Sequence, residues 1–262
     1  MPVVLHKIII VCFLYGEIKM FNLNLGLNKS SERLKFDECV GKFQDIINER
    51  KKTLPTLSAV FRVKNAETYL ELSVTSIALI CSEIIIVDNN SSDRTLEIAN
   101  EIKDKLSNIC DVKIYSYNKE LAIAGENYGR FLTNENSLAS YYDFAFSKAT
   151  SEYVMKADAH LLYVPKALIK IQDMLKKNKR VIIFRGVEVY GMKLSFERYI
   201  FKNDGTYSFV DGIFYEELKF NYRLSKLEQL LSTVFMPCFI HFKRLRYISM
   251  LGANDLVEKL YK

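Results

Sequence analysis

The chain has 262 residues, of which 49% are hydrophobic and 26% charged, and its formal net charge is +6. This composition fits one large soluble α/β domain, or such a domain with an extension. The five cysteines form no close pairs and show no zinc-type spacing, which predicts a reducing, cytoplasmic location. The chain has no glycine-rich phosphate loop and no nucleic-acid-binding signature, which argues against a nucleoside triphosphatase, a dehydrogenase or a nucleic-acid partner.

Residues 3–15 form an apolar run interrupted by His6 and Lys7. A transmembrane helix needs about 20 apolar residues, so the run predicts an added edge strand rather than a membrane anchor or signal peptide. Residues 32–52 have the spacing of an amphipathic helix, and Pro55 marks the entry to the next domain. The chain therefore divides into an N-terminal extension, residues 1–52, and a main domain, residues 53–262.

The main domain begins with two segments in which an apolar strand leads into a helix. Residues 57–63 predict a strand, and an apolar helical stripe follows over residues 70–80. Residues 84–87 form a continuous apolar run, as in a parallel strand buried on both faces. Six polar residues, 88–93, separate this run from a helix that begins at Thr95. Asp88 is placed to accept a hydrogen bond from a base or ribose, although the same residues are also good turn formers.

A third segment, residues 151–160, combines a short strand with a candidate metal site. The apolar residues 153–155 predict the strand, and Asp158 and His160 follow at the alternation that would place both side chains on one side. A carboxylate and an imidazole at the carboxyl end of a strand suit a divalent cation such as Mn²⁺. The alternative is a solvated aspartate beside a histidine that serves only the fold.

The second half contains further predicted strands and a third histidine. Residues 180–186 predict a buried strand that ends at Gly186, and residues 203–205 predict a hairpin turn after a strand at 196–202. His241 alternates with Phe239 in a short apolar strand. A lone histidine between phenylalanines packs in a core as readily as it binds a metal, so both interpretations of His241 remain open.

Positive charge is concentrated in residues 176–180 and 243–246. The first group ends a predicted helix, where basic residues complement the helix dipole. Three anionic partners fit such clusters: the diphosphate of a donor, an anionic acceptor glycan and an anionic membrane surface. A merely solvated face is the alternative, and peripheral contact with a membrane is left open.

In order and spacing, three of these segments resemble glycosyltransferase family 2, whose members transfer sugars from nucleotide-diphospho-sugars and have the GT-A fold. Asn65-Ala-Glu67 resembles the family's Asn-Glu-Glu turn. Residues 87–95 resemble its Val-Asp-Asp-Gly-Ser-Thr-Asp-Gly-Thr segment, and residues 149–160 resemble its segment ending in Asp-Ala-Asp. The resemblance implies an α/β fold, namely a Rossmann-like α/β/α sandwich with a mostly parallel central sheet. It also implies a donor half at about 53–165 and an acceptor half at about 166–250.

The chain departs from the family pattern at four positions. His160 replaces the second acid of the Asp-x-Asp motif, which makes a metal site less negative. Asn89 replaces an aspartate, and Arg94 and Ser151 replace glycines. Metal binding is therefore still expected, at a site that carries less negative charge.

The resemblance also implies roles for individual residues. Candidate metal ligands for Mn²⁺ or Mg²⁺ are Asp158, His160 and His241. Candidate contacts to the donor nucleotide are Arg62, Asn65, Glu67, Asp88, Asn90 and Asp93.

Around Arg198 and Tyr215-Glu216 the chain resembles lipopolysaccharide-core-type members of the family. An inverting transferase needs a carboxylate to take the proton of the acceptor hydroxyl. Glu216 is the first candidate for this base and Asp211 the second. The implied acceptor is a glycan or a lipid-linked glycan.

Two rival functions remain open. A sugar nucleotidyltransferase would carry a glycine-rich loop after its first strand, but residues 62–67 contain no glycine. A non-catalytic descendant of the fold, which binds a nucleotide or glycan, would be consistent with the Asp-x-His variation. A change in nucleotide-diphosphate affinity on adding Mn²⁺ would favour the enzyme.

Overall fold

The computed structural model describes residues 30–188 and 193–242, with side chains from residue 40 onward. The predicted run at 3–15 and the basic cluster at 243–246 lie outside these residues. The helices are α2 (Ser30–Lys51), α3 (Leu70–Ile77), α4 (Thr95–Leu106), α5 (Tyr128–Phe131), α6 (Leu138–Phe146), α7 (Pro165–Lys176) and α8 (Lys226–Leu231). The strands are β1 (Leu57–Val63), β2 (Glu83–Asp88), β3 (Asp111–Ser116), β4 (Tyr153–Ala157), β5 (Leu161–Tyr163), β6 (Val181–Glu188), β7 (Glu197–Lys202), β8 (Tyr207–Asp211), β9 (Glu216–Phe220) and β10 (Thr233–His241). In this part of the chain, no helix is both long and apolar enough to cross a bilayer.

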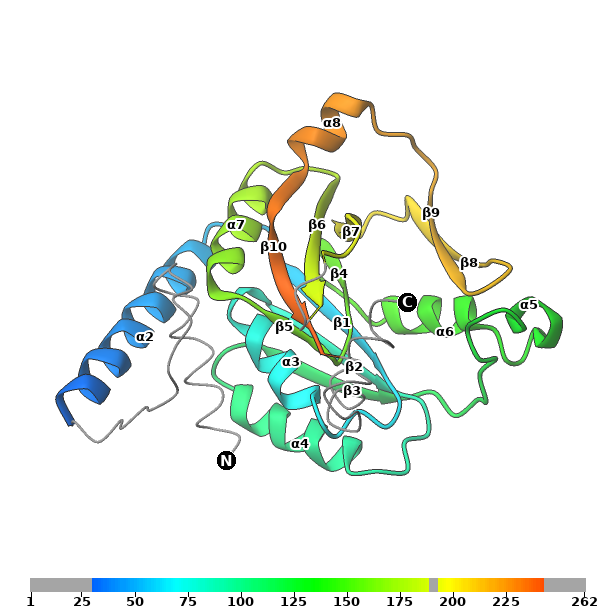
Figure 1. Cartoon of the computed structure of the whole chain (residues 1–262), viewed down its shortest axis with the longest axis horizontal. Coiled ribbons are helices and arrows are strands. Elements are labelled where there is room, and N and C mark those ends of the chain that lie inside the picture. Colours follow the sequence, from blue (N-terminus) through cyan, green and yellow to red (C-terminus); the bar gives the residue numbers. More distant parts are fainter. Residues whose placement is uncertain (1–29, 189–192, 243–262) are drawn as a thin grey trace, which may run out of the picture.

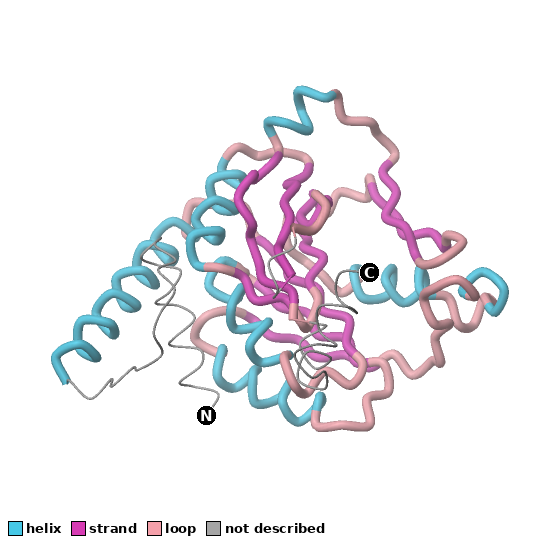
Figure 2. The backbone as a smooth tube through the Cα atoms, viewed as in Figure 1, coloured by secondary structure: helices cyan, strands magenta, loops and turns pink. Residues whose placement is uncertain are grey.

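Eight strands form one mostly parallel sheet in the order β3-β2-β1-β4-β7-β6-β10-β5, and Figures 1 and 2 show helices packed around it. Only β7 and β5 run antiparallel to their neighbours. The apolar runs predicted for β1, β2 and β4 are buried, as expected of parallel strands covered on both faces. The predicted α/β fold with a mostly parallel sheet is therefore confirmed.

Alternate side chains of the strands enter two separate hydrophobic cores. On one face, Phe61 and Met155 pack with the apolar residues of α3, α4 and α7. On the other face, Val60 and Val154 pack with α6 and with Phe209 of β8. This period of two assigns each side chain of a strand to one layer, which makes the domain an α/β/α sandwich.

Two sequence predictions about the second half are wrong. The turn at residues 203–205 does not join a hairpin, because β7 pairs with β4 and β6 while β8 pairs with β9 in a separate two-stranded sheet. The strand predicted to end at Gly186 continues to Glu188. Glycine is needed at 186 because a Cβ there would lie 2.1 Å from the ring of Phe239 on β10, so this glycine permits close packing rather than a strand exit.

The predicted helix of the extension is present as α2, and it is fixed to the domain by polar contacts. Arg50 donates through Nε to Gln172 of α7 at 2.9 Å and also pairs with Asp173. The buried Gln172 side chain donates in turn to the carbonyl of Ile47 at 3.1 Å. The predicted helix over residues 70–80 ends at Ile77 and continues as a 3-10 turn, Ala78–Ile80.

Candidate active site

The candidate site lies where the parallel strands end. β1, β2, β4, β6 and β10 run in one direction, so their carboxyl ends meet at one edge of the sheet. Asp88 closes β2, Asp158 follows β4, Glu188 closes β6 and His241 closes β10. Open α/β sheets bind their ligands at this edge.

Asp88 carries an unused acceptor at this edge. Its side chain is 2% exposed, and Oδ2 accepts a hydrogen bond from the amide of Ser91 at 3.1 Å. Its Oδ1 is buried and has no hydrogen-bond partner in the described structure. Buried polar atoms are almost always paired in folded proteins, so Oδ1 suits a donor group supplied by a ligand.

The departure at Asn89 has a structural reason. Asn89 is 1% exposed, and its Nδ2 donates to the carbonyls of Tyr117 at 2.8 Å and Lys119 at 2.7 Å. An aspartate could not donate these two bonds. Asn89 therefore anchors the segment after β3, while Asn90, with φ of 52°, turns the loop through the left-handed region.

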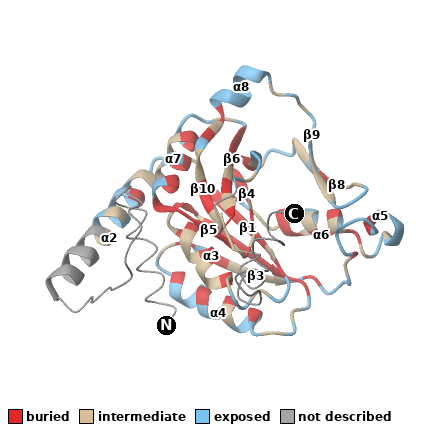
Figure 3. Cartoon of the chain, viewed as in Figure 1, coloured by how far each residue is buried: buried red, intermediate tan, exposed pale blue. Residues whose placement is uncertain are grey.

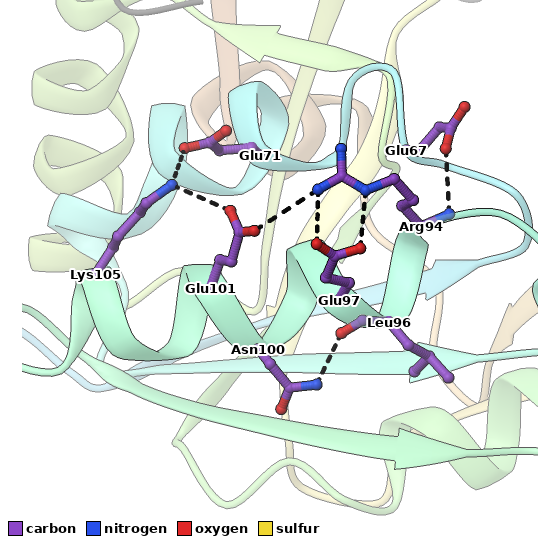
Figure 4. A network of polar contacts seen from close by, with 8 residues as sticks. All are labelled: Glu67, Glu71, Arg94, Leu96, Glu97, Asn100, Glu101 and Lys105. Atoms are coloured by element: carbon purple, nitrogen blue, oxygen red, sulfur yellow. Dashed lines mark hydrogen bonds and ion pairs between the residues drawn. The ribbon is translucent and has the colours of Figure 1, made fainter.

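Three of the predicted nucleotide contacts hold two loops to each other. Asn65 Oδ1 accepts from the amide of Ser92 at 2.8 Å, and Asp93 Oδ2 accepts from the amide of Glu67 at 3.1 Å. Glu67 Oε2 accepts from the amide of Arg94 at 3.1 Å (Figure 4). These bonds join the loop after β1 to the loop after β2. The structure thus assigns Asn65, Glu67 and Asp93 a loop-shaping role, and direct contact with a nucleotide stays a prediction.

Arg62 and Asp158 form an ion pair at the centre of the edge. The Arg62 side chain is 3% exposed, and its Nη2 lies 2.7 Å from Asp158 Oδ1. Burial alone would raise the pKa of Asp158, but the charges of Arg62 and then His160 hold it below its ordinary value. Asp158 therefore stays ionised, and one of its two oxygens is already engaged by Arg62.

The guanidinium of Arg62 also connects Asp158 to Glu216. It lies 3.9 Å from the centre of the Tyr142 ring, a cation–π contact. The Tyr142 hydroxyl interacts with Glu216. Burial is the main cause that raises the pKa of Tyr142, and the contact with Glu216 raises it further. Arg62 Nε and Nη1 are buried without a hydrogen-bond partner in the described residues. The first-choice base thus belongs to the same polar cluster as the candidate metal ligand.

Asp211 is committed to structural contacts. Its carboxylate accepts from the Tyr128 hydroxyl, from Ser137 Oγ at 2.6 Å and from the amide of Ala139 at 2.9 Å. Burial would raise its pKa, but these hydrogen bonds lower it below the usual range. Asp211 therefore caps α6 and fixes β8 against it, a role that disfavours it as a base.

The turn after β4 corrects the predicted placement of Asp158 and His160. The strand ends at Ala157, because β5 pairs antiparallel with β10 and the chain must reverse first. Ser73 Oγ holds this turn through the carbonyls of Asp158 at 2.7 Å and Leu161 at 2.6 Å. The two side chains therefore do not share a face by strand alternation. The charge of His160 nevertheless lowers the pKa of Asp158.

Glu188, which the sequence pattern did not single out, is buried next to His241. The pairing of β6 with β10 places Glu188 and His241 opposite each other. His241 Nδ1 lies 2.9 Å from Glu188 Oε1. The His241 ring meets the His160 ring edge-on, with centroids 4.7 Å apart. An acid directly after a buried apolar strand, as at Asp88, was the signal that could have identified Glu188.

The candidate metal ligands fit a metal ion only in part. In residues 40–188 and 193–242, no three His, Cys, Asp or Glu side chains converge well enough to hold a metal ion. Asp158, which is 34% exposed, has a second oxygen beyond the one that faces Arg62, and His160 and His241 are close by. Mg²⁺ is commonly held by one or two protein ligands together with substrate phosphates, so the residues fit a metal that shares ligands with a donor.

This α/β sheet, with acids and a buried arginine gathered at its carboxyl edge, has the layout in which open α/β sheets bind their ligands. Residues 58–245, more than half of the chain, match the family model described as "Glycosyl transferase family 2". The chain therefore belongs to glycosyl transferase family 2. The match does not reach the finer resemblance to lipopolysaccharide-core-type members, which stays a prediction. A comparison with curated proteins gave no match.

Among solved structures, the chain is similar to S. aureus TarS 1–349, with 14% identity, a TM-score of 0.48, and coverage of 74% of this chain and 62% of that one. The same fragment in complex with UDP gives 14% identity, a TM-score of 0.47, and coverage of 71% and 60%. Glucosyl-3-phosphoglycerate synthase from Mycobacterium tuberculosis, in complex with Mn²⁺, UDP and glucosyl-3-phosphoglycerate, gives 14% identity, a TM-score of 0.38, and coverage of 55% and 48%. The chain thus spans less than two thirds of the proteins it resembles, and the assignment rests on the family match.

Proposed function

We propose that the protein transfers a sugar from a nucleotide-diphospho-sugar to a hydroxyl of a glycan or lipid-linked acceptor, with inversion at the anomeric carbon and with a divalent metal. The observation that carries the proposal is the cluster in which buried Arg62 joins Asp158 to Tyr142 and Glu216. It joins Asp158, after β4, to Glu216 of the β8-β9 sheet in one polar cluster, within the segment that matches the family.

The donor would lie over the ends of β1, β2 and β4. Asp88 Oδ1, unpaired and buried, would accept from the nucleoside. The free nitrogens of Arg62 would donate toward the diphosphate, where a positive charge is needed as the leaving group departs. The hydrogen bonds of Asn65, Glu67 and Asp93 would hold the loop after β1 and the loop after β2 together around this site.

Asp158, His160 and His241 would hold Mn²⁺ or Mg²⁺ together with oxygens of the donor. Such a metal, when bound, supplies positive charge that offsets the charge on the departing diphosphate. Glu216, held by Tyr142 beside Arg62, would take the proton from the acceptor hydroxyl as the hydroxyl attacks. A cytoplasmic location stays a prediction from cysteine usage.

Ligand-induced stabilisation tests the donor class directly. We expect nucleoside diphosphates and nucleotide sugars to raise the melting temperature, and Mn²⁺ to increase that shift, because a ligand that binds only the native state stabilises it. Transfer should then be measured with the best donor. If Mn²⁺ leaves the shift unchanged for every nucleotide, the metal part of the proposal is wrong; if no nucleotide shifts the melting temperature, the donor part is wrong.

Asp88→Ala should weaken nucleotide-diphosphate binding by about 10- to 100-fold even when EDTA is present, because a hydrogen bond to a charged group is lost. Isothermal titration measures this. Asp104→Ala, an exposed acid on α4, is the matched control and should bind as the wild type does. Unchanged affinity in Asp88→Ala would remove Asp88 from the donor site.

Glu188→Gln should weaken Mn²⁺ binding by about 10- to 100-fold, because a carboxylate that orients a metal-binding histidine raises its basicity and fixes its tautomer. The measurements are Mn²⁺ affinity in the presence of nucleoside diphosphate and the nitrogen chemical shifts of His241. Glu101→Gln, on the surface of α4, is the control. Wild-type Mn²⁺ affinity together with an unchanged His241 tautomer would show that Glu188 serves packing alone.

A further inference from the structure

The basic cluster at residues 176–180 lies at the wrong end of the sheet to meet a donor. It immediately precedes β6, whose other end carries Glu188 at the candidate site. Eight residues of strand span about 25 Å, so the cluster is separated from the site by the length of β6. Contact with the donor diphosphate, one of the three partners expected from the sequence, is therefore ruled out for this cluster.

Helix α8 lies beside the cluster. The pKa of Glu228 on α8 is lowered mainly by its bonds to Ser225 and further by the charges of Arg180 and Lys179. The Arg180 guanidinium also lies 4.8 Å from the centre of the Tyr222 ring, in the segment before α8. Figure 1 shows α8 as a projection at the end of the molecule where β10 begins, far from where β10 ends.

Helix α8 presents leucines to solvent. Leu227, Leu230 and Leu231 are 63%, 56% and 51% exposed, and no residue of the helix is buried (Figure 3). Their spacing of three and four residues places them on one face. Ser225 and Glu228 form a complete capping box, so the helix start is well defined although the helix gains nothing from core packing. Isolated exposed leucines are ordinary, but three on one projecting face mark an interaction site.

Lysines line the neighbouring face of the molecule, along α7. A surface groove between α7 and β10 is lined by Lys166, Lys170, Lys177 and the 58% exposed Phe235, among others. The one acid in its lining, Asp173, is already paired with Arg50 and lies 3.7 Å from Lys170. Ser232 alone separates α8 from the strand that forms this groove, so α8 adjoins one end of the groove, where Thr233 and Val234 line it.

We propose that this surface, the leucine face of α8 together with the lysines of α7, docks on an anionic lipid membrane. An exposed apolar helix beside a lysine-lined groove has the chemistry of a segment that rests in the headgroup region, with leucines inserted and lysines against anionic lipids. An apolar helix face would also fit the groove of a protein partner, but the neighbouring lysines favour an anionic lipid surface. The candidate site, at the far end of β10, then faces the aqueous side, so docking localises the enzyme without occupying its acceptor site.

The test is co-sedimentation of the full chain with vesicles. We expect binding to vesicles of phosphatidylcholine mixed with phosphatidylglycerol, much weaker binding to phosphatidylcholine alone, and loss of binding at high salt. Replacing Lys166, Lys170 and Lys177 with Gln should reduce the affinity by about 100-fold, since each basic residue near an anionic surface contributes about a factor of five. Leu227→Ser with Leu230→Ser and Leu231→Ser should abolish insertion at unchanged melting temperature.

Matched controls are Lys103→Gln on α4 and Ile123→Ser, which change an exposed lysine and an 87% exposed isoleucine elsewhere; both should bind as the wild type does. Transfer to a soluble acceptor should be unaffected in every variant, which separates this proposal from the proposed function. Absence of binding to anionic vesicles would overturn the proposal. So would equal binding to neutral vesicles, binding that survives both sets of changes, or leucine changes that alter the oligomeric state in solution and leave vesicle binding intact.

Discussion

Asp158→Asn should reduce sugar transfer by about 10³-fold or more, because the charge that holds the cation is removed and metal stabilisation contributes several kcal/mol to the transition state. It should also remove the increase in nucleotide affinity that Mn²⁺ gives the wild type. The measurements are the transfer rate at saturating donor and the nucleotide affinity with and without Mn²⁺. Retention of wild-type transfer in the purified variant would contradict the metal assignment.

The ion pair with Arg62 requires a control for folding in this experiment. Asparagine at 158 leaves a guanidinium that is 3% exposed without its charged partner, so the melting temperature should fall. The decisive comparison is therefore made in EDTA, where wild type and variant should bind the nucleotide equally if the metal is the only route by which Asp158 acts. Weaker binding by the variant in EDTA would indicate a damaged site instead.

Much of the sheet could be predicted from sequence, because a parallel strand buried on both faces leaves a continuous apolar signal. The runs 57–63, 84–87 and 153–155 all fall within β1, β2 and β4. Their polar ends could then be assigned to one edge, since parallel strands end together. The sequence therefore predicts that Asp88 and Asp158 lie at that edge, as they do in the structure.

The contacts that decide the roles of these acids could not be predicted in this way. Pairing of Glu188 with His241 depends on the register of two strands about fifty residues apart, with bulges between them. The ion pair of Arg62 with Asp158 joins residues 96 positions apart. Alternation predicted a shared face for Asp158 and His160, but the later pairing of β5 with β10 imposes a turn there. Tertiary pairing overrode the local pattern at each of these positions.

Helix α6 connects the two halves of the site. Tyr141 donates from its hydroxyl to the carbonyl of Val87 at 2.6 Å, next to Asp88, while Tyr142 contacts Arg62 and Glu216. The N-terminus of the helix holds Asp211 through Ser137 and Ala139. One helix thus positions the donor-side loop, the buried arginine and the β8–β9 hairpin. Substitutions in this hairpin should therefore alter binding of the donor.

The two candidate bases should separate in kinetics. Glu216→Gln keeps the shape and hydrogen-bonding capacity of the side chain but cannot accept a proton, so turnover should fall by about 10²–10⁴-fold with donor affinity nearly unchanged. Asp211→Asn should act on stability instead. Its carboxylate accepts from Tyr128, Ser137 and Ala139, and an amide nitrogen would face one of these donors, at a cost of about 1–3 kcal/mol in the free energy of unfolding.

The pH dependence of stability distinguishes the two residues further. Because its hydrogen bonds lower the folded-state pKa of Asp211, this carboxylate stabilises the fold above its unfolded pKa and loses that contribution as pH falls through the folded value. Asp211→Asn should therefore flatten the decline in stability at acid pH, whereas Glu216→Gln should leave that contribution intact. Turnover, donor affinity and acid unfolding of both variants decide the matter. Normal turnover in Glu216→Gln with inactive, stably folded Asp211→Asn would reverse the assignment, and full activity in both would remove the acceptor half of the proposal.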